Sequence, residues 1–383
     1  MSLVRYALAS AAALSLGTAA PTNVRHRPPG PPPEIASHVE VLRTAHGVPH
    51  IRAENLEAAG YALGYVMSED YGARVVLGLL RGRGESARLF GRDSLEGDFS
   101  NRMSYARAVA GWPTLDDDTR AVYTGFAEGV TRWAELHPEA LPAGFDARFT
   151  GYDVLSYEVN VATPAQAARF LARLDPSARP LGRRAAQQPE GDPVETEPLV
   201  GSDADVGSNA WALAPSRTKS KRAILLRNPH LQWNAGYYEA HVTVPGKVDF
   251  YGDFRVGSPF SVVGGFNRDL GFATTNNDPL LSQIYALDAD TAKADHYLLD
   301  GASLPLQREE VTVEYADGQA IATETRGMWR TTLGPVVARQ NGKIYVLRAA
   351  GDGDVRGGEQ FLRMMQARSL DEFKTAMRMR ARA

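Results

Sequence analysis

A polar segment rich in proline and acidic residues divides this 383-residue chain into two parts with different hydrophobic patterns. The segment, residues 185–207, holds few large apolar side chains, so it cannot bury enough surface to order itself. Ahead of it, apolar residues such as Val122, Phe126 and Val130 recur at helical spacing. The segment is either a linker between domains or a spacer peptide that is excised.

Short runs of alternating or β-branched residues after position 208 predict strands. Turn signals such as Pro245-Gly246 and Asp317-Gly318 separate them at hairpin spacing. We therefore expect an α+β fold, with a helical half over residues 40–184 and an antiparallel-sheet half over residues 208–383. The predicted strands include residues 223–226, 241–244, 248–251, 261–266, 311–315 and 344–347.

Two capping signals mark the N-terminal ends of predicted helices. Asn55 precedes an apolar helical pattern and is expected to cap it. Ser369 and Glu372 form a capping box. The helix that this box opens is expected to continue to Ala383, which suggests a fragment or a truncated gene product.

The N-terminus is typical of an export signal. Arg5 is followed by the apolar run 6–16 and by small residues up to position 20, where cleavage is predicted. An alanine-rich amphipathic helix is the alternative, but a polar face is missing and Pro21 follows at once. The run is too short to span a bilayer stably. We expect a periplasmic or secreted protein, with residues 21–39 forming a proline-rich extended segment.

Composition excludes several kinds of function. A formal net charge of -3 provides no basic surface, so nucleic acid is not an expected partner. The chain has no cysteine, which excludes thiol nucleophiles, disulfides and metal sites built on cysteine. Covalent catalysis would have to use Ser, Thr, Lys or a carboxylate.

The bond between Gly207 and Ser208 lies where the polar segment meets the first predicted strand. Glycine lets the backbone strain there, so the serine hydroxyl can attack the preceding carbonyl and free its own α-amine. An α-amino group, with a pKa of roughly 7.7 to 8.0, suits the role of general base. Gly-Ser also occurs at 201–202, inside the polar segment, and at 257–258, ahead of a proline.

Several short motifs follow one another in a fixed order along the chain: residues 43–51, 60–65, 68–70, 208–212, 228–230, 244–246 and 270–276. This ordered set resembles the penicillin acylase family, and most closely its branch of acyl-homoserine-lactone and aculeacin-type acylases. The resemblance runs from about Glu40 to the last residue. It implies the sandwich fold of N-terminal-nucleophile hydrolases, here incomplete, with two antiparallel sheets between helical layers.

The resemblance also assigns roles to single residues. Ser208 would be the nucleophile and, through its amine, the base. His230 would hold that amine and assist self-cleavage, although a histidine that only caps a turn is the alternative. Asn276 would give a backbone N–H to the oxyanion, while the family's second donor, an asparagine side chain, lies beyond residue 383.

The implied activity is hydrolysis of an N-acyl amide such as an acyl-homoserine lactone, a lipopeptide or a penicillin, without a cofactor. The implied assembly is a heterodimer of the two processed chains. Two alternatives stay open: a non-catalytic homologue that binds acyl ligands or a partner, and a penicillin V type acylase. The acyl pocket, or equally the core, is expected to contain Trp211, Trp233, Phe254 and Phe260.

No metal site is expected. His46 and His50 have helical spacing, but Gly47 and Pro49 prevent a helix there, so both histidines are interpreted as structural. Some family members bind calcium just after the backbone donor. The corresponding residues here, 277–283, include leucine and glutamine, which do not support such a site.

Overall fold

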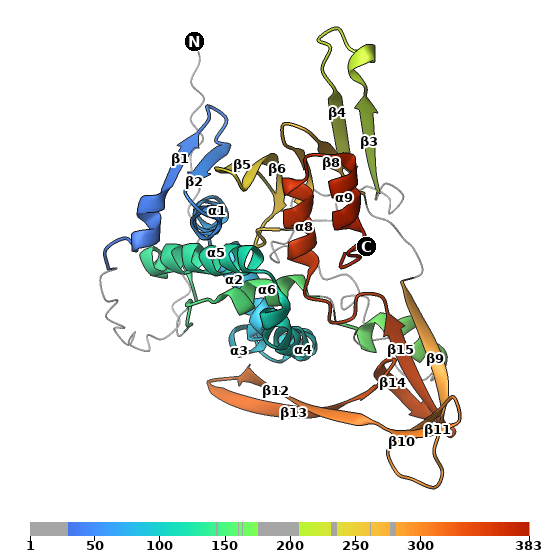
Figure 1. The fold of residues 1–383 in the computed structure, drawn as a ribbon. Coiled ribbons are helices and arrows are strands. Elements are labelled where there is room, and N and C mark those ends of the chain that lie inside the picture. Colours follow the sequence, from blue (N-terminus) through green and yellow to red (C-terminus); the bar gives the residue numbers. More distant parts are fainter. Residues whose placement is uncertain are drawn as a thin grey trace, which may run out of the picture. The chain divides into compact units, whose positions relative to one another are not determined.

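The fold was analysed in a computed structural model that describes residues 30–142, 145–159, 161–162, 164–174, 207–230, 236–260, 262–275 and 281–382. Most helices precede residue 207 and most strands follow it, which confirms the α+β prediction (Figure 1). The predicted signal peptide and residues 185–206 lie outside the described part, so the domain boundaries stay predictions. The helices are α1 (Leu56–Tyr71), α2 (Ala73–Arg83), α3 (Ser86–Phe90), α4 (Leu95–Gly111), α5 (Asp117–Leu136), α6 (Gly151–Glu158), α7 (Ala168–Leu174), α8 (Gly357–Gln366) and α9 (Leu370–Met377).

Polar side chains cap several helices. The Asn55 side chain accepts a hydrogen bond of 2.9 Å from the backbone N–H of Ala58, as predicted for the start of α1. Asp116 caps α5 in the same way, accepting from Thr119 at 2.8 Å. Each cap satisfies a backbone donor that has no partner within its helix, so the sequence itself determines where these helices begin.

Helices α1 and α5 cross at short range because glycines line their contact. A Cβ atom added to Gly60 or Gly64 would meet a backbone carbonyl oxygen of α5. A Cβ atom added to Gly125 or Gly129 would meet one of α1. The side chains of Val122, Phe126 and Val130 are buried beside this crossing, which confirms the predicted apolar stripe.

The strands form three sheets. The first has the order β1-β2-β5-β6-β7-β8, the second the order β11-β10-β9-β15-β14-β13-β12, and the third is the hairpin β3-β4. The strands are β1 (Val39–Arg43), β2 (Pro49–Ala53), β3 (Gly207–Leu213), β4 (Ile224–His230), β5 (Tyr237–Val244), β6 (Val248–Arg255), β7 (Val262–Phe266), β8 (Gly271–Ala273), β9 (Ser282–Ala289), β10 (His296–Leu299), β11 (Ala302–Pro305), β12 (Gln307–Asp317), β13 (Ala320–Thr331), β14 (Gly334–Gln340) and β15 (Lys343–Ala349).

The six-stranded sheet joins the two halves of the sequence. Alternate residues of β5 and β6 are buried, among them Val242, Phe250 and Phe254, and they belong to the same core as the helical stripe. The turn between these strands contains Gly246, whose φ of 76° is the left-handed conformation that glycine adopts without strain. The predicted hairpin at Pro245-Gly246 is therefore confirmed.

Two local expectations were wrong. Residues 40–184 were expected to be mainly helical, but residues 40–53 contribute most of β1 and all of β2, and β2 pairs in parallel with β5. The last helix was expected to continue to residue 383, but α9 ends at Met377. Beyond it, Gln360 of α8 accepts hydrogen bonds from the backbone N–H groups of Ala381 and Arg382, which holds the chain in a turn.

Candidate active site around Ser208

Ser208 is the second residue of the hairpin β3-β4. The antiparallel register places Ser208 opposite Pro229 and Gly207 opposite His230. The two motifs that the sequence analysis connected, 207–208 and 228–230, are therefore neighbours across one strand pair. This pairing brings the backbone of His230 beside the bond that is predicted to be cleaved.

The alternation of side chains along a strand gives the hairpin two faces. Ser208, Ala210 and Ala212 alternate along β3 and point to one face. Arg227 and Leu225 lie directly opposite Ala210 and Ala212, so their side chains share the face of Ser208. This face is turned toward β7 and β8. The Leu225 side chain packs against Gly271, where an added Cβ atom would lie 3.1 Å from it, and Arg227 packs against Gly264.

Arg227 holds the hairpin to the six-stranded sheet. Its guanidinium forms an ion pair with Asp253 of β6 and stacks over the ring of Tyr237, 5.7 Å from the ring centroid. Both side chains of the ion pair are mostly buried, and burial lowers the pKa of Arg227. A charged pair therefore lies on the same face of the hairpin as Ser208.

The segment after β8 reaches the backbone of Ser208. The Thr275 hydroxyl donates a hydrogen bond of 3.4 Å to the carbonyl oxygen of Ser208. Asn276, the predicted backbone donor to the oxyanion, is the next residue and lies outside the described part of the chain. Its role stays a prediction, although its neighbour in sequence contacts the predicted nucleophile.

His230 lies on the opposite face from the Ser208 side chain, together with Asn209 and Asn228. Its Nε2 atom is 3.2 Å from the side-chain amide nitrogen of each of these asparagines. If both amides donate, Nε2 is an acceptor and the ring proton is on Nδ1. These two hydrogen bonds fix the orientation of the imidazole.

The three described aromatic residues of the predicted acyl pocket do not gather at one place. Trp211 is 52% exposed, on the face opposite to Ser208. Phe254 and Phe260 are buried in the core, where Phe260 packs edge-to-face on Tyr123 with ring centroids 4.9 Å apart. Trp233 lies outside the described residues. Their part in substrate binding stays untested.

Sequence reasoning did not find Asn209, Asn228 and Thr275 as contacts of the site. Asn228 belongs to a motif used for the family resemblance, and Thr275 precedes the predicted donor, but neither was given a role. Pairing the two predicted strands in the observed register would have placed Asn209 directly opposite Asn228 and so beside His230.

The described residues contain neither a metal-binding cluster nor a membrane-spanning helix. No group of three or more His, Asp or Glu side chains is arranged to hold a metal ion. Within the same ranges, no helix is long and apolar enough to cross a membrane.

Comparison with known proteins identifies the family. The penicillin amidase family model matches residues 38–381. The acyl-homoserine lactone acylase PvdQ of Pseudomonas fluorescens (strain Pf0-1) is 29% identical over 90% of this chain and 47% of its own length. Aculeacin-A acylase of Actinoplanes utahensis is 24% identical over 88% of this chain and 46% of its own length. A solved penicillin G acylase of Alcaligenes faecalis has 24% identity and a TM-score of 0.37, covering 44% of this chain and 30% of that one.

The chain belongs to the penicillin amidase family, because the family model covers most of its length. The resemblance to acyl-homoserine-lactone and aculeacin-type acylases is confirmed by the relatives found. The chain spans about half the length of the curated relatives that it matches.

Proposed function

We propose that this protein is a self-processing amide hydrolase in which Ser208, freed by cleavage after Gly207, removes the acyl chain of an N-acyl substrate. The observation that carries the proposal is the register of β3 and β4. In this register the Gly207-Ser208 bond lies beside His230, at the start of β3. The carbonyl oxygen of Ser208 accepts a hydrogen bond from Thr275. Membership of the penicillin amidase family supports the same reaction class.

The first step would be cleavage of the chain itself. The Ser208 hydroxyl attacks the carbonyl carbon of Gly207, and the peptide nitrogen leaves as the α-amine of Ser208. Water then hydrolyses the resulting ester, which leaves a carboxylate on Gly207 and a free hydroxyl on Ser208. The two products would stay together as a heterodimer, since β2 of the first part pairs with β5 of the second.

The second reaction would use the new α-amine. It accepts the hydroxyl proton as the serine oxygen attacks the amide carbonyl of the substrate, and its pKa of about 7.7 to 8.0 suits this transfer near neutral pH. The proton then passes to the leaving amine, and water hydrolyses the acyl ester. A backbone N–H at Asn276 would stabilise the oxyanion, where one donor contributes about 2.7 to 4 kcal/mol.

His230 would orient the amine instead of attacking the substrate. Its backbone faces the cleavage site, and its ring is held by Asn209 and Asn228. We expect His230→Ala to slow self-cleavage while the fold is kept, as followed by circular dichroism and a cleavage time course. Asn228→Ala should have a smaller effect in the same direction, because one of the two ring contacts remains. Unchanged rates in both variants would leave His230 with a structural role only.

The substrate class is proposed from the relatives. Their names point to acyl-homoserine lactones, aculeacin A and penicillin G. Hydrolysis of an acyl-homoserine lactone would inactivate a quorum-sensing signal, and hydrolysis of a penicillin side chain would link the enzyme to antibiotic response. Both fit a periplasmic or secreted protein, which we propose from the predicted signal peptide.

Intact mass and N-terminal sequencing of the purified protein test the proposal. We expect a second chain that begins at Ser208, and an uncleaved product from Ser208→Ala. Ser202→Ala is the matched control, since it removes the other serine that follows a glycine near the polar segment and should cleave normally. A second chain that begins at any residue other than Ser208 would overturn the assignment of the nucleophile, whereas an N-terminus at Pro21 would only report removal of the predicted signal peptide.

A substrate panel tests the chemistry that follows. Acyl-homoserine lactones of several lengths, a lipopeptide, penicillins G and V and a chromogenic acyl amide are compared, with Ser208→Ala as background. Turnover of penicillin V alone would favour the penicillin V type of acylase. Binding of acyl compounds without cleavage of chain or substrate would favour the non-catalytic homologue.

A further inference from the structure

Two histidines face each other across the parallel strands β2 and β5. The register places His50 opposite His241, and their Nδ1 atoms are 3.0 Å apart. The rings meet edge to face, with centroids 5.0 Å apart, and both side chains are partly buried. The pair lies outside the candidate active site, and His50, within the motif of residues 43–51, was expected to have only a structural role.

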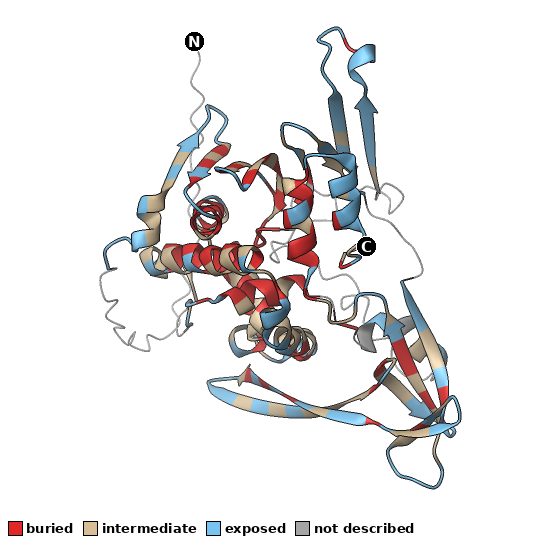
Figure 2. Ribbon diagram, in the orientation of Figure 1, coloured by how far each residue is buried: buried red, intermediate tan, exposed pale blue. Residues whose placement is uncertain are grey.

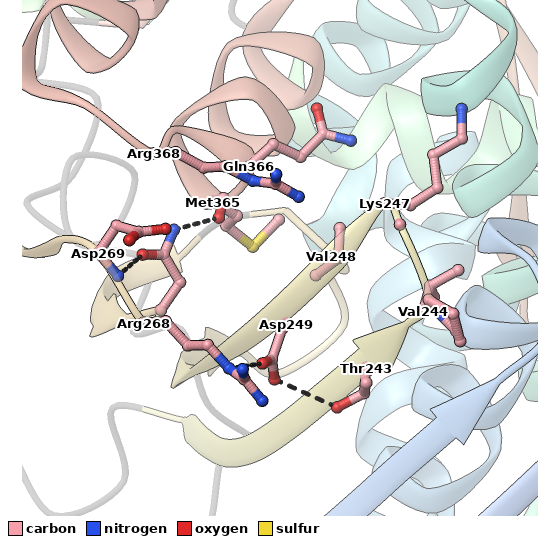
Figure 3. A pocket seen from close by; sticks show the side chains of 13 residues that line it. Thr243, Val244, Lys247, Val248, Asp249, Arg268, Asp269, Met365, Gln366 and Arg368 are labelled. Carbon is pink, nitrogen blue, oxygen red and sulfur yellow. Dashed lines mark hydrogen bonds and ion pairs between the residues drawn. The ribbon is translucent and has the colours of Figure 1, made fainter.

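A carboxylate determines the proton positions in this pair. His241 Nε2 lies 2.9 Å from Asp249 Oδ1, and this contact lowers the pKa of Asp249. The ionised carboxylate can only accept, so in the neutral form of His241 the proton is on Nε2 and the Nδ1 atom presents a lone pair. His50 therefore donates from Nδ1, because two N–H groups cannot point at each other over 3.0 Å. Figure 3 shows Asp249 between Arg268 and Thr243, which it also contacts at 3.2 and 3.4 Å.

We propose that the Nδ1 atoms of His50 and His241 form a two-histidine chelate for a nitrogen-preferring divalent cation, Cu²⁺, Ni²⁺ or Zn²⁺. Two metal–nitrogen bonds of about 2.0 to 2.1 Å meeting at roughly 95 to 110° span about 3.0 to 3.4 Å between the nitrogens. The observed separation of 3.0 Å lies at the lower end of that range. On binding, the His50 proton moves from Nδ1 to Nε2, so both Nδ1 lone pairs reach the ion.

The surroundings support a cation of this class. A carboxylate on the far nitrogen of a ligand histidine fixes the tautomer and the orientation of the ring, and Asp249 holds this position beside His241. A cavity of about 510 Å³ beside the pair gives an ion access from solvent. Glu40 and Asp249 line this cavity and offset the charges of Arg52 and Arg268, which line it too. Imidazole donors in such a setting select Cu²⁺, Ni²⁺ or Zn²⁺ over Ca²⁺ and Mg²⁺.

The number of ligands sets the strength of the site. The pair supplies two protein ligands, and no third side chain completes a group of three among the described residues. Water would fill the other positions, so the ion would exchange more readily than in a four-ligand structural zinc site. His50 precedes the proposed cleavage site and His241 follows it. If the proposed processing occurs, a bound ion would also bridge the two chains.

The test uses the full chain carrying Ser208→Ala, so that self-cleavage does not affect the result. Titration calorimetry with Cu²⁺, Ni²⁺ and Zn²⁺ should show one site, and Ca²⁺ should not bind there. His50→Gln and His241→Gln should each weaken binding at least tenfold, and Asp249→Asn should weaken it about 10- to 100-fold.

His46→Gln is the matched control, because this exposed histidine lies in the turn that leads into β2 and should leave the affinity unchanged. Circular dichroism of each variant shows whether the fold is kept. If His241→Gln does not fold, His50→Gln decides the question. Absence of binding by the Ser208→Ala chain, or equal binding by this chain with and without His50→Gln, would show that the pair is only a hydrogen bond between strands.

Discussion

The crossing of α1 and α5 and the hairpin β3-β4 differ in how tightly they are held. At the crossing, glycines bring the two backbones together and the neighbouring side chains are buried (Figure 2). In the hairpin, Ser208 lies on a face held by a few contacts, while Trp211 and Leu226 on the other face are about half exposed. The crossing therefore tolerates little change, whereas the hairpin has freedom to move.

This difference suits the proposed reaction of Ser208 with its own backbone. Self-cleavage needs the Gly207-Ser208 bond to adopt a strained geometry for a short time, and a rigidly packed strand would resist it. The nearby contacts of Arg227, Leu225 and Thr275 keep the serine in place without enclosing it. The dense helical core supplies the stability that the hairpin lacks.

The largest expected effect tests the tightness of the helix crossing. In Gly64→Ala/Gly125→Ala, each new methyl group meets a backbone carbonyl oxygen, which cannot move aside unless the helices separate. Overpacking of this kind costs about 3 kcal/mol per site, a large part of a typical folding free energy. Urea unfolding should show a strong loss of stability or no folded protein.

Gly78→Ala is the matched control for this experiment. Gly78 is also in a helix, but nothing lies within 4 Å of an added Cβ atom there. Alanine should stabilise that position by roughly 0.5 to 1 kcal/mol. Equal behaviour of the two sets of variants would mean that the helices do not cross as closely as the structure shows.

The next effect tests the attachment of the hairpin. Arg227→Met leaves Asp253 charged, mostly buried and without its ion-pair partner, which costs about 3 kcal/mol. We expect amide hydrogen exchange to speed up in β3 and β4, and self-cleavage to slow, while exchange in α1 and α5 stays slow. Arg227→Met/Asp253→Asn should regain most of the loss, because no charge is then left unpaired. Uniform acceleration across the protein would contradict a locally held hairpin.

A third effect depends on pH and concerns the helical core. Glu158 is buried at the end of α6, where it accepts hydrogen bonds from Tyr123 and Ser258, and burial raises its pKa. The folded state thus binds this proton more tightly than the unfolded state. The free energy of unfolding should fall as pH rises above about 4.3, by at most about 1.4 kcal/mol per pH unit.

Glu158→Gln should remove the share of this slope that Glu158 contributes, since glutamine does not titrate. Asp98 and Glu128, whose pKa values burial also raises, keep the rest. Glu34→Gln, at an exposed glutamate, should keep the slope of the wild type. Chemical unfolding at several pH values between 4 and 7 compares the three proteins. A slope that survives in Glu158→Gln would have to come from another group.

Features that depend on near neighbours in the sequence were predictable. The caps at Asn55 and Ser369, the buried stripe of α5 and the turn at Gly246 all rest on residues a few positions apart. At the candidate site, a family motif was enough to connect Ser208 with His230. The fold class followed from the same local patterns.

Features that depend on distant pairing were not predictable. His50 and His241 are 191 positions apart, and no local pattern shows that β2 and β5 pair in parallel. The same holds for Thr275, which reaches Ser208 over 67 positions. Strand order and register select these partners, and both are set by the packing of the whole sheet.

The smallest effect on stability concerns the exposed face of the hairpin. Trp211, Leu213, Ile224 and Leu226 are paired on that face, and each is about half exposed. A contiguous apolar face of this kind favours association, either with another protein surface or with a second copy of the chain.

Trp211→Gln should therefore change the unfolding free energy by no more than about 0.5 kcal/mol but reduce self-association clearly. Sedimentation velocity over a range of concentrations measures the association. Ile321→Gln is the control, because Ile321 on β13 is 50% exposed but lies outside this face, and it should leave association unchanged. A wild-type chain that stays monomeric throughout that range would show that the face does not drive self-association.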